Sequence, residues 1–411
     1  MVVVYNLLIL VYGLIIRIFS LFNHKAALFV NGRKNWHEKL KDKITPESRY
    51  IWFHCASLGE FEQGRPVMEE IKLRFPEYKI LLTFFSPSGY EIRKNYPGAE
   101  TICYLPMDTP ANARKFLNII RPEKAFFVKY EFWYNFLHEL NKRKIPVFVF
   151  SANFRQNQHF FSSWPWSKWF RKMLNGFDRI FVQSSASADL LKSFGINRVT
   201  VSGDTRFDRV AKIAESAKEM KVVEKFKDNH RIIVAGSTWK PDEELIIRFI
   251  NQSEGIKYII APHEVSETNI NRIVQLLKKP SIRFSRMNNE NALAHDVLVI
   301  DSVGLLSSLY KYGEIAYIGG GFGVGIHNIL EAATFGLPVV FGPNHEKFRE
   351  AVELKSLEGA FCIGNFNNLE STFRKLLETT DIREKASLAA VNYVKNNLGA
   401  TNLIIKKSFG I

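Results

Sequence analysis

The chain has 411 residues, of which 46% are hydrophobic and 24% charged, and its 56 Lys and Arg against 41 Asp and Glu give a formal net charge of +15. One core rarely holds more than about 300 residues, so this length predicts two domains, and the composition excludes a disordered chain. The charge favours an anionic membrane surface or anionic substrates, whereas nucleic acid is not expected, because no basic block with interleaved aromatics occurs. Cys55, Cys103 and Cys362 lack the spacing of metal ligands, which predicts reduced thiols and no metal site.

The first segment, residues 1–22, is apolar apart from Asn6 and Arg17. It is just long enough to cross a bilayer as a helix. No Lys or Arg precedes it, which argues against a cleaved signal sequence. Basic residues follow it, namely Lys25, Arg33, Lys34, Lys39, Lys41 and Lys43. The positive-inside rule then predicts an inner-membrane anchor, spanning or interfacial, with the rest of the chain in the cytoplasm. The alternative is a buried helix of the soluble body.

Two stretches of the chain alternate between short apolar runs and helix-length segments, which is typical of doubly wound parallel sheets. We expect a first domain over residues 23–205, a helical linker over 206–228 and a second domain over 229–411. The first domain has strand candidates at 50–55, 79–84, 124–129, 146–150, 179–183 and 198–202, and the second at 231–236, 257–261, 296–300, 314–318 and 337–341. Helices are expected at 241–252, 266–278, 368–378 and 383–397. Two α/β domains of this kind predict a two-lobed protein with a cleft.

Residues 54–64, His-Cys-Ala-Ser-Leu-Gly-Glu-Phe-Glu-Gln-Gly, follow the first predicted strand and open a helix. Open α/β sheets bind their ligands at such places. Gly59 is expected to allow a tight turn and Glu60 to present a carboxylate at the mouth of the sheet. Alternatively, Glu60 only complements the dipole of the helix start, and spacing alone favours this second interpretation.

Two further stretches of the first domain carry charged candidates. Residues 129–135 end a strand and supply a second carboxylate, Glu131, although their aromatics are more typical of a core. In residues 203–208, Arg206 is positioned to reach an anion in the cleft.

A glycine-rich stretch over residues 317–333 is the most distinctive part of the second domain. It contains neither a GxGxxG nor a P-loop pattern, which disfavours dinucleotide oxidoreductases and P-loop NTPases. Its glycines suit a close approach of backbone amides to a phosphate, with Glu331 placed to bind ribose hydroxyls. A glycine-rich turn without a ligand is the alternative.

The two preceding strands of the second domain also end in polar residues. Ser237 and Thr238 either cap the next helix or offer hydroxyls and amides to a phosphate. His263 follows Pro262 at the end of the next strand. A lone His is usually structural or solvated, and only its place at the sheet edge favours a binding role.

In combination, several of these stretches resemble the 3-deoxy-D-manno-octulosonic acid (Kdo) transferases of lipopolysaccharide synthesis. The motifs that carry the likeness are Gly59-Glu60, Tyr130-Glu131-Phe132-Trp133, Gly203 to Asp208, Gly236-Ser237-Thr238-Trp239 and His327-Asn328-Ile329-Leu330-Glu331. The resemblance implies a GT-B architecture of two Rossmann-like lobes. It also implies transfer of Kdo from CMP-Kdo to a lipid A precursor (lipid IVA), without a metal or other cofactor.

The resemblance further implies roles for individual residues. Glu60 falls on the general base, and Glu131 and Arg206 fall on positions that stabilise the transition state. The CMP-contacting segments correspond to Pro262, His263, Gly304, Leu305, Leu306, Asn328, Ile329, Leu330 and Glu331. The chain departs from the family pattern in three places: Arg206 stands where Lys is frequent, His263 where Arg is frequent, and Leu305 where many members carry Glu.

Three alternatives remain open from the residues. The first is another GT-B nucleotide-sugar transferase acting on a different lipid. The second is a sugar-nucleotide epimerase, which has no need for residues 1–22, so that membrane association separates it from the transferases. The third is a catalytically inactive, membrane-attached scaffold, which nucleotide binding would exclude.

Overall fold

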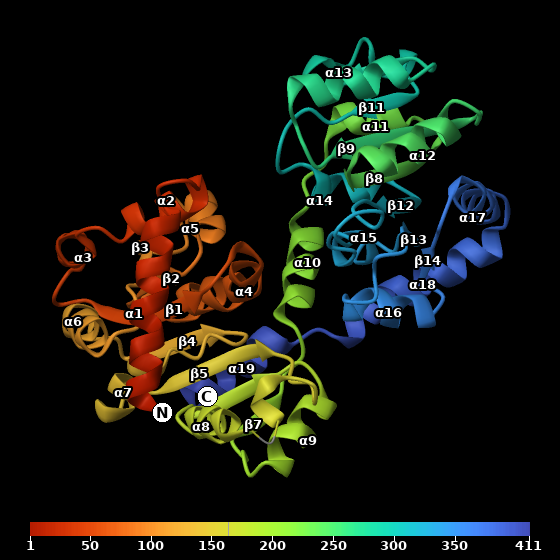
Figure 1. Cartoon of the computed structure of the whole chain (residues 1–411). Coiled ribbons are helices and arrows are strands. Elements are labelled where there is room, and N and C mark those ends of the chain that lie inside the picture. The colour runs from red at the N-terminus through yellow and green to blue at the C-terminus, as the bar shows by residue number, and fades with distance from the viewer. Residues whose placement is uncertain (163) are drawn as a thin grey trace. The chain divides into compact units, whose positions relative to one another are not determined.

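The computed structural model describes residues 1–162 and 164–411, and it divides into two compact units. Unit 1 comprises Met1–Asp208 and Leu398–Ile411, and unit 2 comprises Arg209–Asn397. Each unit is built on a seven-stranded sheet in which all pairs are parallel, with helices on its faces (Figure 1). The predicted pair of parallel α/β sheets is therefore confirmed.

The sheet of unit 1 has the strand order β3-β2-β1-β4-β5-β6-β7. Its strands are β1 (Arg49–Cys55), β2 (Tyr78–Phe84), β3 (Thr101–Tyr104), β4 (Lys124–Val128), β5 (Val147–Ala152), β6 (Arg179–Val182) and β7 (Val199–Val201). Its helices are α1 (Val2–Phe19), α2 (His24–Gly32), α3 (Trp36–Lys43), α4 (Leu58–Arg74), α5 (Pro87–Arg93), α6 (Pro110–Ile120), α7 (Tyr134–Lys142), α8 (Pro165–Leu174), α9 (Ser185–Ser193), the start of α10 (Thr205–Ser216), and α19 (Ala400–Phe409).

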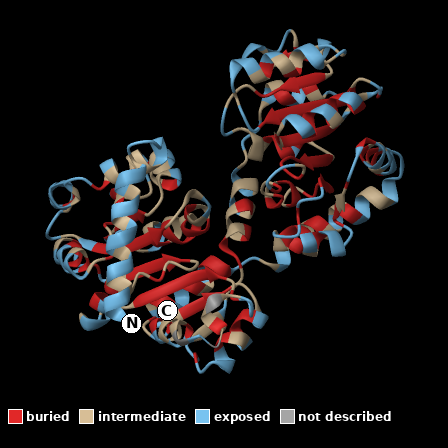
Figure 2. Ribbon diagram, in the orientation of Figure 1, coloured by how far each residue is buried: buried red, intermediate tan, exposed pale blue. Residues whose placement is uncertain are grey.

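Both faces of this sheet are buried, which is why its central strands are continuous apolar runs. Successive side chains of β1 point to opposite faces. Trp52 therefore packs into one core layer with Phe116 and Phe127, whereas Phe53 packs into the other with Phe126. Figure 2 shows the sheets as buried and the outer faces of the helices as exposed.

The sheet of unit 2 has the order β10-β11-β9-β8-β12-β13-β14. Its strands are β8 (Arg231–Thr238), β9 (Ile256–Pro262), β10 (Ser281–Arg283), β11 (Val297–Val299), β12 (Ile315–Ile318), β13 (Val339–Phe341) and β14 (Ala360–Cys362). Its helices, besides the rest of α10, are α11 (Lys221–Lys227), α12 (Lys240–Ile250), α13 (Glu267–Leu276), α14 (Leu306–Leu309), α15 (Leu330–Ala333), α16 (Arg349–Ser356), α17 (Phe366–Glu378) and α18 (Thr380–Asn396).

The structure places the boundaries of the units differently from the sequence-based expectation. The last fourteen residues, Leu398–Ile411, belong to unit 1 rather than to the second domain. Ile404 and Ile405 of α19 are buried in the core of unit 1, and the Phe409 ring stacks on Phe75 at 4.2 Å. Asp208 accepts the backbone amides of Gly399 and Thr401 and so fixes the start of α19. The predicted linker, 206–228, consists of α10, within which the units divide, and α11, which lies in unit 2.

Helix α1 lies along unit 1 with its outer face exposed (Figures 1 and 2). None of its described residues is buried, so the alternative of a core helix is wrong. Among the described residues it is the one helix long and apolar enough to cross a membrane. Its inner face is nevertheless attached by specific contacts. The Tyr5 hydroxyl donates to Asp108 at 2.5 Å, Asn6 accepts from the Asn135 amide at 2.9 Å, and Tyr12 stacks on Phe85.

Candidate functional site

The Glu60 carboxylate lies in the first turn of α4, directly after the carboxyl end of β1. Ser57 is the N-cap residue of this helix. The carboxylate accepts the backbone amides of Ala56 and Ser57. Helix starts leave such amides unpaired, so Glu60 satisfies donors of its own helix. Glu60 thus pairs with amides at the start of its own helix, and this is compatible with a chemical role.

Gly59 does not make the tight turn that its sequence position predicted. It lies within the first turn of α4, its φ is not positive, and a Cβ added to it would meet no heavy atom within 4 Å. The helix begins directly after Ser57, its N-cap residue, whose backbone is extended. The consequence of Gly59 is an exposed, unobstructed space beside Glu60.

The pKa of Glu60 is raised to about 7. Burial is the largest cause, and the negative charge of Glu131 is the second. The amides of Ala56 and Ser57 and the ammonium of Lys129 oppose this rise, because they favour the ionised form. A carboxylate whose pKa lies near physiological pH is suited to accept a proton and release it again.

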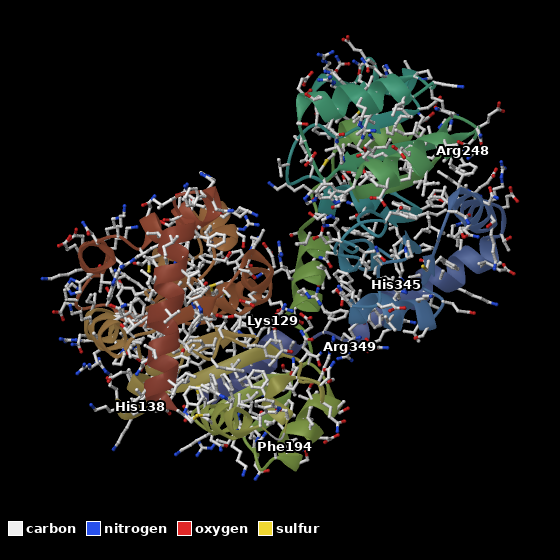
Figure 3. All side chains as sticks on the ribbon, in the orientation of Figure 1. Lys129, His138, Phe194, Arg248, His345 and Arg349 are labelled. Atoms are coloured by element: carbon white, nitrogen blue, oxygen red, sulfur yellow. The ribbon has the colours of Figure 1, made fainter. Side chains whose placement is uncertain are left out.

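Glu131 lies in the loop between β4 and α7. Lys129, labelled in Figure 3, begins this loop in the left-handed region with a φ of 63°. Such a conformation is costly for a residue other than glycine and is typical of functional sites. Glu131 Oε2 accepts the indole N–H of Trp133 at 2.9 Å, and His54 Nε2 lies 3.3 Å from the same oxygen.

The residues around Glu131 were not predicted as site residues. His54 is fully buried on β1, and its Nδ1 lies 2.9 Å from the Thr83 hydroxyl of β2. Trp133 was expected to be a core aromatic, but its indole N–H contacts both Glu131 and His54. An ionisable side chain inside a buried strand needs a polar partner, and this was the available signal for His54.

Arg206 is attached to α4 through Asp204. Its guanidinium donates to Asp204 Oδ2 at 2.8 and 3.0 Å. Buried Asp204 also accepts the side-chain amides of Gln63, at 3.3 Å, and Gln183, at 2.8 Å. Since Gln63 lies one turn after Glu60 on α4, the structure connects Arg206 to the helix that carries Glu60. Asp204 is a residue that the sequence analysis did not single out.

In unit 2, Ser237 and Thr238 end β8 at a register irregularity, and Ser237 has a φ of 52°. The Thr238 hydroxyl is buried and donates to Glu243 at 3.1 Å. Trp239, not Ser237 or Thr238, is the N-cap residue of α12, and its amide donates to Asp242 at 2.9 Å. The capping alternative for Ser237 and Thr238 is therefore wrong.

The glycine-rich loop after β12 is packed tightly against neighbouring backbone. A Cβ on Gly319 would lie 2.3 Å from the carbonyl oxygen of Ser237, and one on Gly321 would lie 2.6 Å from Gly342. Buried Asp242 accepts the amide of Gly320 at 2.9 Å. The glycines thus serve close packing of the loop on its neighbours. The helix that follows, α15, has only four residues.

The rings of Trp239, His263 and His327, which come from the segments predicted to bind the CMP donor, contact one another. Trp239 Nε1 donates to His327 Nε2 at 3.0 Å, and the two rings are nearly coplanar, at 13°. The exposed His263 ring stacks over both, with centroids 4.4 and 4.5 Å away. Burial, together with His263, lowers the pKa of His327, so this ring stays neutral and accepts a hydrogen bond from the indole N–H.

The remaining predicted donor residues lie at the same edge of the unit 2 sheet. Asn328 donates to Glu331 at 3.1 Å and accepts the Leu330 amide at 3.2 Å, while Ile329 is buried. Burial raises the pKa of Glu331. Gly304 has a φ of 92° and precedes Leu305 and Leu306, and the Leu306 side chain lies over Gly236 at the end of β8. Among the described residues, no group of three His, Cys, Asp or Glu is placed to hold a metal ion.

The chain is similar in sequence to one family of known proteins. A sequence model described as 3-deoxy-D-manno-octulosonic-acid transferase matches residues 34–209. The chain is 29% identical to the 3-deoxy-D-manno-octulosonic acid transferase of Aquifex aeolicus over 80% of this chain and 86% of that one. It is 28% identical to that of Rickettsia bellii over 85% of this chain and 83% of that one.

Among solved structures, the chain is similar to a UDP-GlcNAc 2-epimerase from Neisseria meningitidis, with a TM-score of 0.63 and 17% identity over 88% of this chain and 100% of that one. At this identity the likeness shows the fold alone, a GT-B-like pair of α/β units, and it does not extend to the epimerase reaction. The sequence matches are with transferases throughout most of the chain. Over most of its length the chain is accordingly similar to the 3-deoxy-D-manno-octulosonic acid transferases, and it is a glycosyltransferase.

Proposed function

We propose that the chain transfers Kdo from CMP-Kdo to a lipid A precursor, lipid IVA, with Glu60 as the general base. The observation that carries this proposal is a partly exposed carboxylate with a pKa of about 7 at the carboxyl edge of the unit 1 sheet. Its location agrees with the Gly-Glu motif of the family, and the open space at Gly59 leaves room for an acceptor hydroxyl.

In the proposed step, the acceptor hydroxyl gives its proton to a Glu60 oxygen as the hydroxyl oxygen bonds to the anomeric carbon of Kdo. The bond from that carbon to the phosphate oxygen of CMP breaks, and CMP leaves with the electron pair. Positive charge develops on the sugar as this bond breaks. The carboxylate of Glu131 is suited to stabilise this charge, and the guanidinium of Arg206 to stabilise the departing phosphate.

We assign donor binding to unit 2. Two features support the assignment: the glycine loop follows β12 at the carboxyl edge of the sheet, and buried Asp242 holds its backbone by accepting the Gly320 amide. The ring cluster of Trp239, His263 and His327 and the carboxylate of Glu331 lie at the same edge. The reaction proposed here uses these groups without a metal or other cofactor.

We assign α1 to membrane attachment at the cytoplasmic face of the inner membrane. Its exposed face is apolar, formed by Val3, Leu7, Leu8, Leu10, Val11, Leu14, Ile15, Ile18 and Phe19. Its inner face contacts Phe85 and Asp108, in the loops that follow β2 and β3, and Tyr134, the first residue of α7 after the loop that follows β4. Glu131 lies in the last of these loops. A lipid acceptor in an anionic membrane would therefore be close to the proposed base.

The test is transfer from CMP-Kdo, generated in situ, to tetra-acylated lipid A precursor, with products identified by mass. We expect a gain of one or more Kdo units, unaffected by EDTA, and a loss of about 100- to 10,000-fold in rate for Glu60→Gln. The matched control is Glu70→Gln on the same helix, whose partner is the surface residue Arg74. An active Glu60→Gln protein would contradict the role of Glu60. Absent transfer with CMP binding retained would move the donor sugar or acceptor elsewhere.

A further inference from the structure

A buried histidine lies beneath the two carboxylates of unit 1, and the proposed reaction does not use it. His54 is fully buried on β1, one residue before Cys55, and its two ring nitrogens face different partners. Nδ1 lies 2.9 Å from the Thr83 hydroxyl oxygen. Nε2 lies 3.0 Å from Trp133 Nε1 and 3.3 Å from Glu131 Oε2.

The hydrogen bonds of the Thr83 hydroxyl indicate which ring nitrogen of His54 carries the proton. The Thr83 hydroxyl donates its hydrogen to the carbonyl of Phe53 and accepts the indole N–H of Trp52 at 2.8 Å. A hydroxyl has two lone pairs and one hydrogen, so its remaining partner, His54 Nδ1, must carry the proton. In the neutral ring Nε2 then has no hydrogen and accepts a hydrogen bond.

The indole N–H of Trp133 is the donor that Nε2 accepts. An indole nitrogen is a donor only, and it lies 3.0 Å from His54 Nε2 and 2.9 Å from Glu131 Oε2, so one hydrogen is shared in a three-centre bond. Trp133 is itself held by packing on Phe85 at 4.6 Å. His54 therefore determines where the Trp133 N–H points, and Trp133 determines where the Glu131 carboxylate lies.

We propose that His54 is a positioning residue, which through Trp133 holds the Glu131 carboxylate beside Glu60 and so maintains the charge environment of the base. The other charged or titratable groups that face the carboxylate pair are Lys129 at the end of β4, Cys55 on β1 and Tyr5 on α1. The inference rests on the function proposed above.

Two substitutions of His54 separate its two sides. The amide nitrogen of Asn, a donor, is as many bonds from Cβ as Nδ1, and the amide oxygen of Gln, an acceptor, is as many as Nε2. His54→Asn therefore keeps a group next to Thr83 and loses the one next to Trp133 and Glu131, whereas His54→Gln keeps the latter. Trp133→Phe removes the shared N–H from a partly exposed ring and serves if His54→Asn does not fold. Glu70→Gln is the control, because it removes a carboxylate of α4 that is paired with Arg74 on the surface.

The readout is the pH dependence of Kdo transfer. Without the fixed Glu131 charge, the pKa of Glu60 falls, the base form persists to lower pH, and the acid limb of kcat/KM moves down by about one unit. For His54→Asn and Trp133→Phe we expect this shift, a kcat lower by about 10- to 100-fold and an unchanged KM for CMP-Kdo. His54→Gln and Glu70→Gln should keep the acid limb of the unaltered protein.

A second measurement separates this inference from the proposed reaction. Titration of the Glu60 carboxyl by NMR, with carbon-13-labelled glutamate assigned by means of Glu60→Gln, reports the same shift without any turnover. If the unaltered protein transfers no Kdo, the proposed function fails while this titration still tests His54. An acid limb and a Glu60 titration that stay in place, or move to higher pH, in both His54→Asn and Trp133→Phe would overturn the inference.

Discussion

The two candidate sites lie at equivalent places, the carboxyl edge of a parallel sheet, but they are built from different groups. The site of unit 1 consists of side chains whose charges oppose one another, with Glu60 and Glu131 close together and His54 buried beneath them. The site of unit 2 consists of backbone brought into close contact at Gly319 and Gly321 and fixed by Asp242. The site of unit 1 is therefore expected to depend on pH, and the site of unit 2 on the close packing of its backbone.

The largest expected effect comes from replacing a glycine by alanine, which should destabilise the protein at the unit 2 site but not at the unit 1 site. Gly319→Ala places a methyl group 2.3 Å from the backbone oxygen of Ser237. We therefore expect the free energy of unfolding to fall by about 3 kcal/mol and CMP binding to be lost. Gly59→Ala places a methyl group in open space on a helix and should leave unfolding free energy unchanged or raise it by about 0.5–1 kcal/mol. Chemical unfolding and a nucleotide-protection assay measure both. Equal losses for the two variants would contradict the comparison.

The next effect is the pH dependence of stability at the unit 1 site. The pKa of Glu60 is raised to about 7 from its ordinary value of 4.5, so folding disfavours its ionised form. This cost is absent below pH 4.5, grows as pH rises to 7 and is complete above pH 7. Glu60→Gln should therefore stabilise the protein by about 1–3 kcal/mol at pH 8 and change little at pH 4.

Denaturant unfolding of both proteins at the two pH values measures this difference. Glu70→Gln is again the control, since that carboxylate is paired on the surface. If Glu60→Gln were destabilising at pH 8, the amides of Ala56 and Ser57 would stabilise the ionised carboxylate by more than burial destabilises it. The pKa of Glu60 would then not be raised.

A smaller effect of opposite sign is expected at the unit 2 site. The pKa of His327 is lowered, first by burial and then by His263, so the cost falls on the protonated form. Stability is then lost as pH falls below about 6.5. His327→Gln retains an acceptor for the Trp239 N–H and removes the charge. It should reduce the loss of stability between pH 7.5 and 5.5, and an equal loss in both proteins would show that His327 does not contribute.

The sequence predicted the central strands of both sheets but not three of the edge strands. Central strands such as β1 are buried on both faces and read as apolar runs. By contrast β3, β10 and β14 have three or four residues each and lie at sheet edges, where little apolar pattern is required. The placement of α19 in unit 1 was missed for a different reason: Ile404 and Phe409 predict burial but not which core receives them.

At the site, sequence order was informative for residues that lie directly after a strand, such as Glu60 and Glu131. It was uninformative for partners brought together by strand register. His54 meets Thr83 because β1 and β2 pair in parallel at those positions, and no spacing along the chain encodes this. Asp204 and Asp242 were missed likewise, because their importance lies in amides supplied by distant segments.

The most direct test of the central claim is the pH profile of kcat/KM for Kdo transfer by the unaltered protein. A general base must be ionised, and Glu60 has a pKa of about 7. We predict an acid limb near pH 7, absent from the residual activity of Glu60→Gln. An acid limb near pH 4.5, or one that persists in Glu60→Gln, would show that Glu60 does not take the acceptor proton.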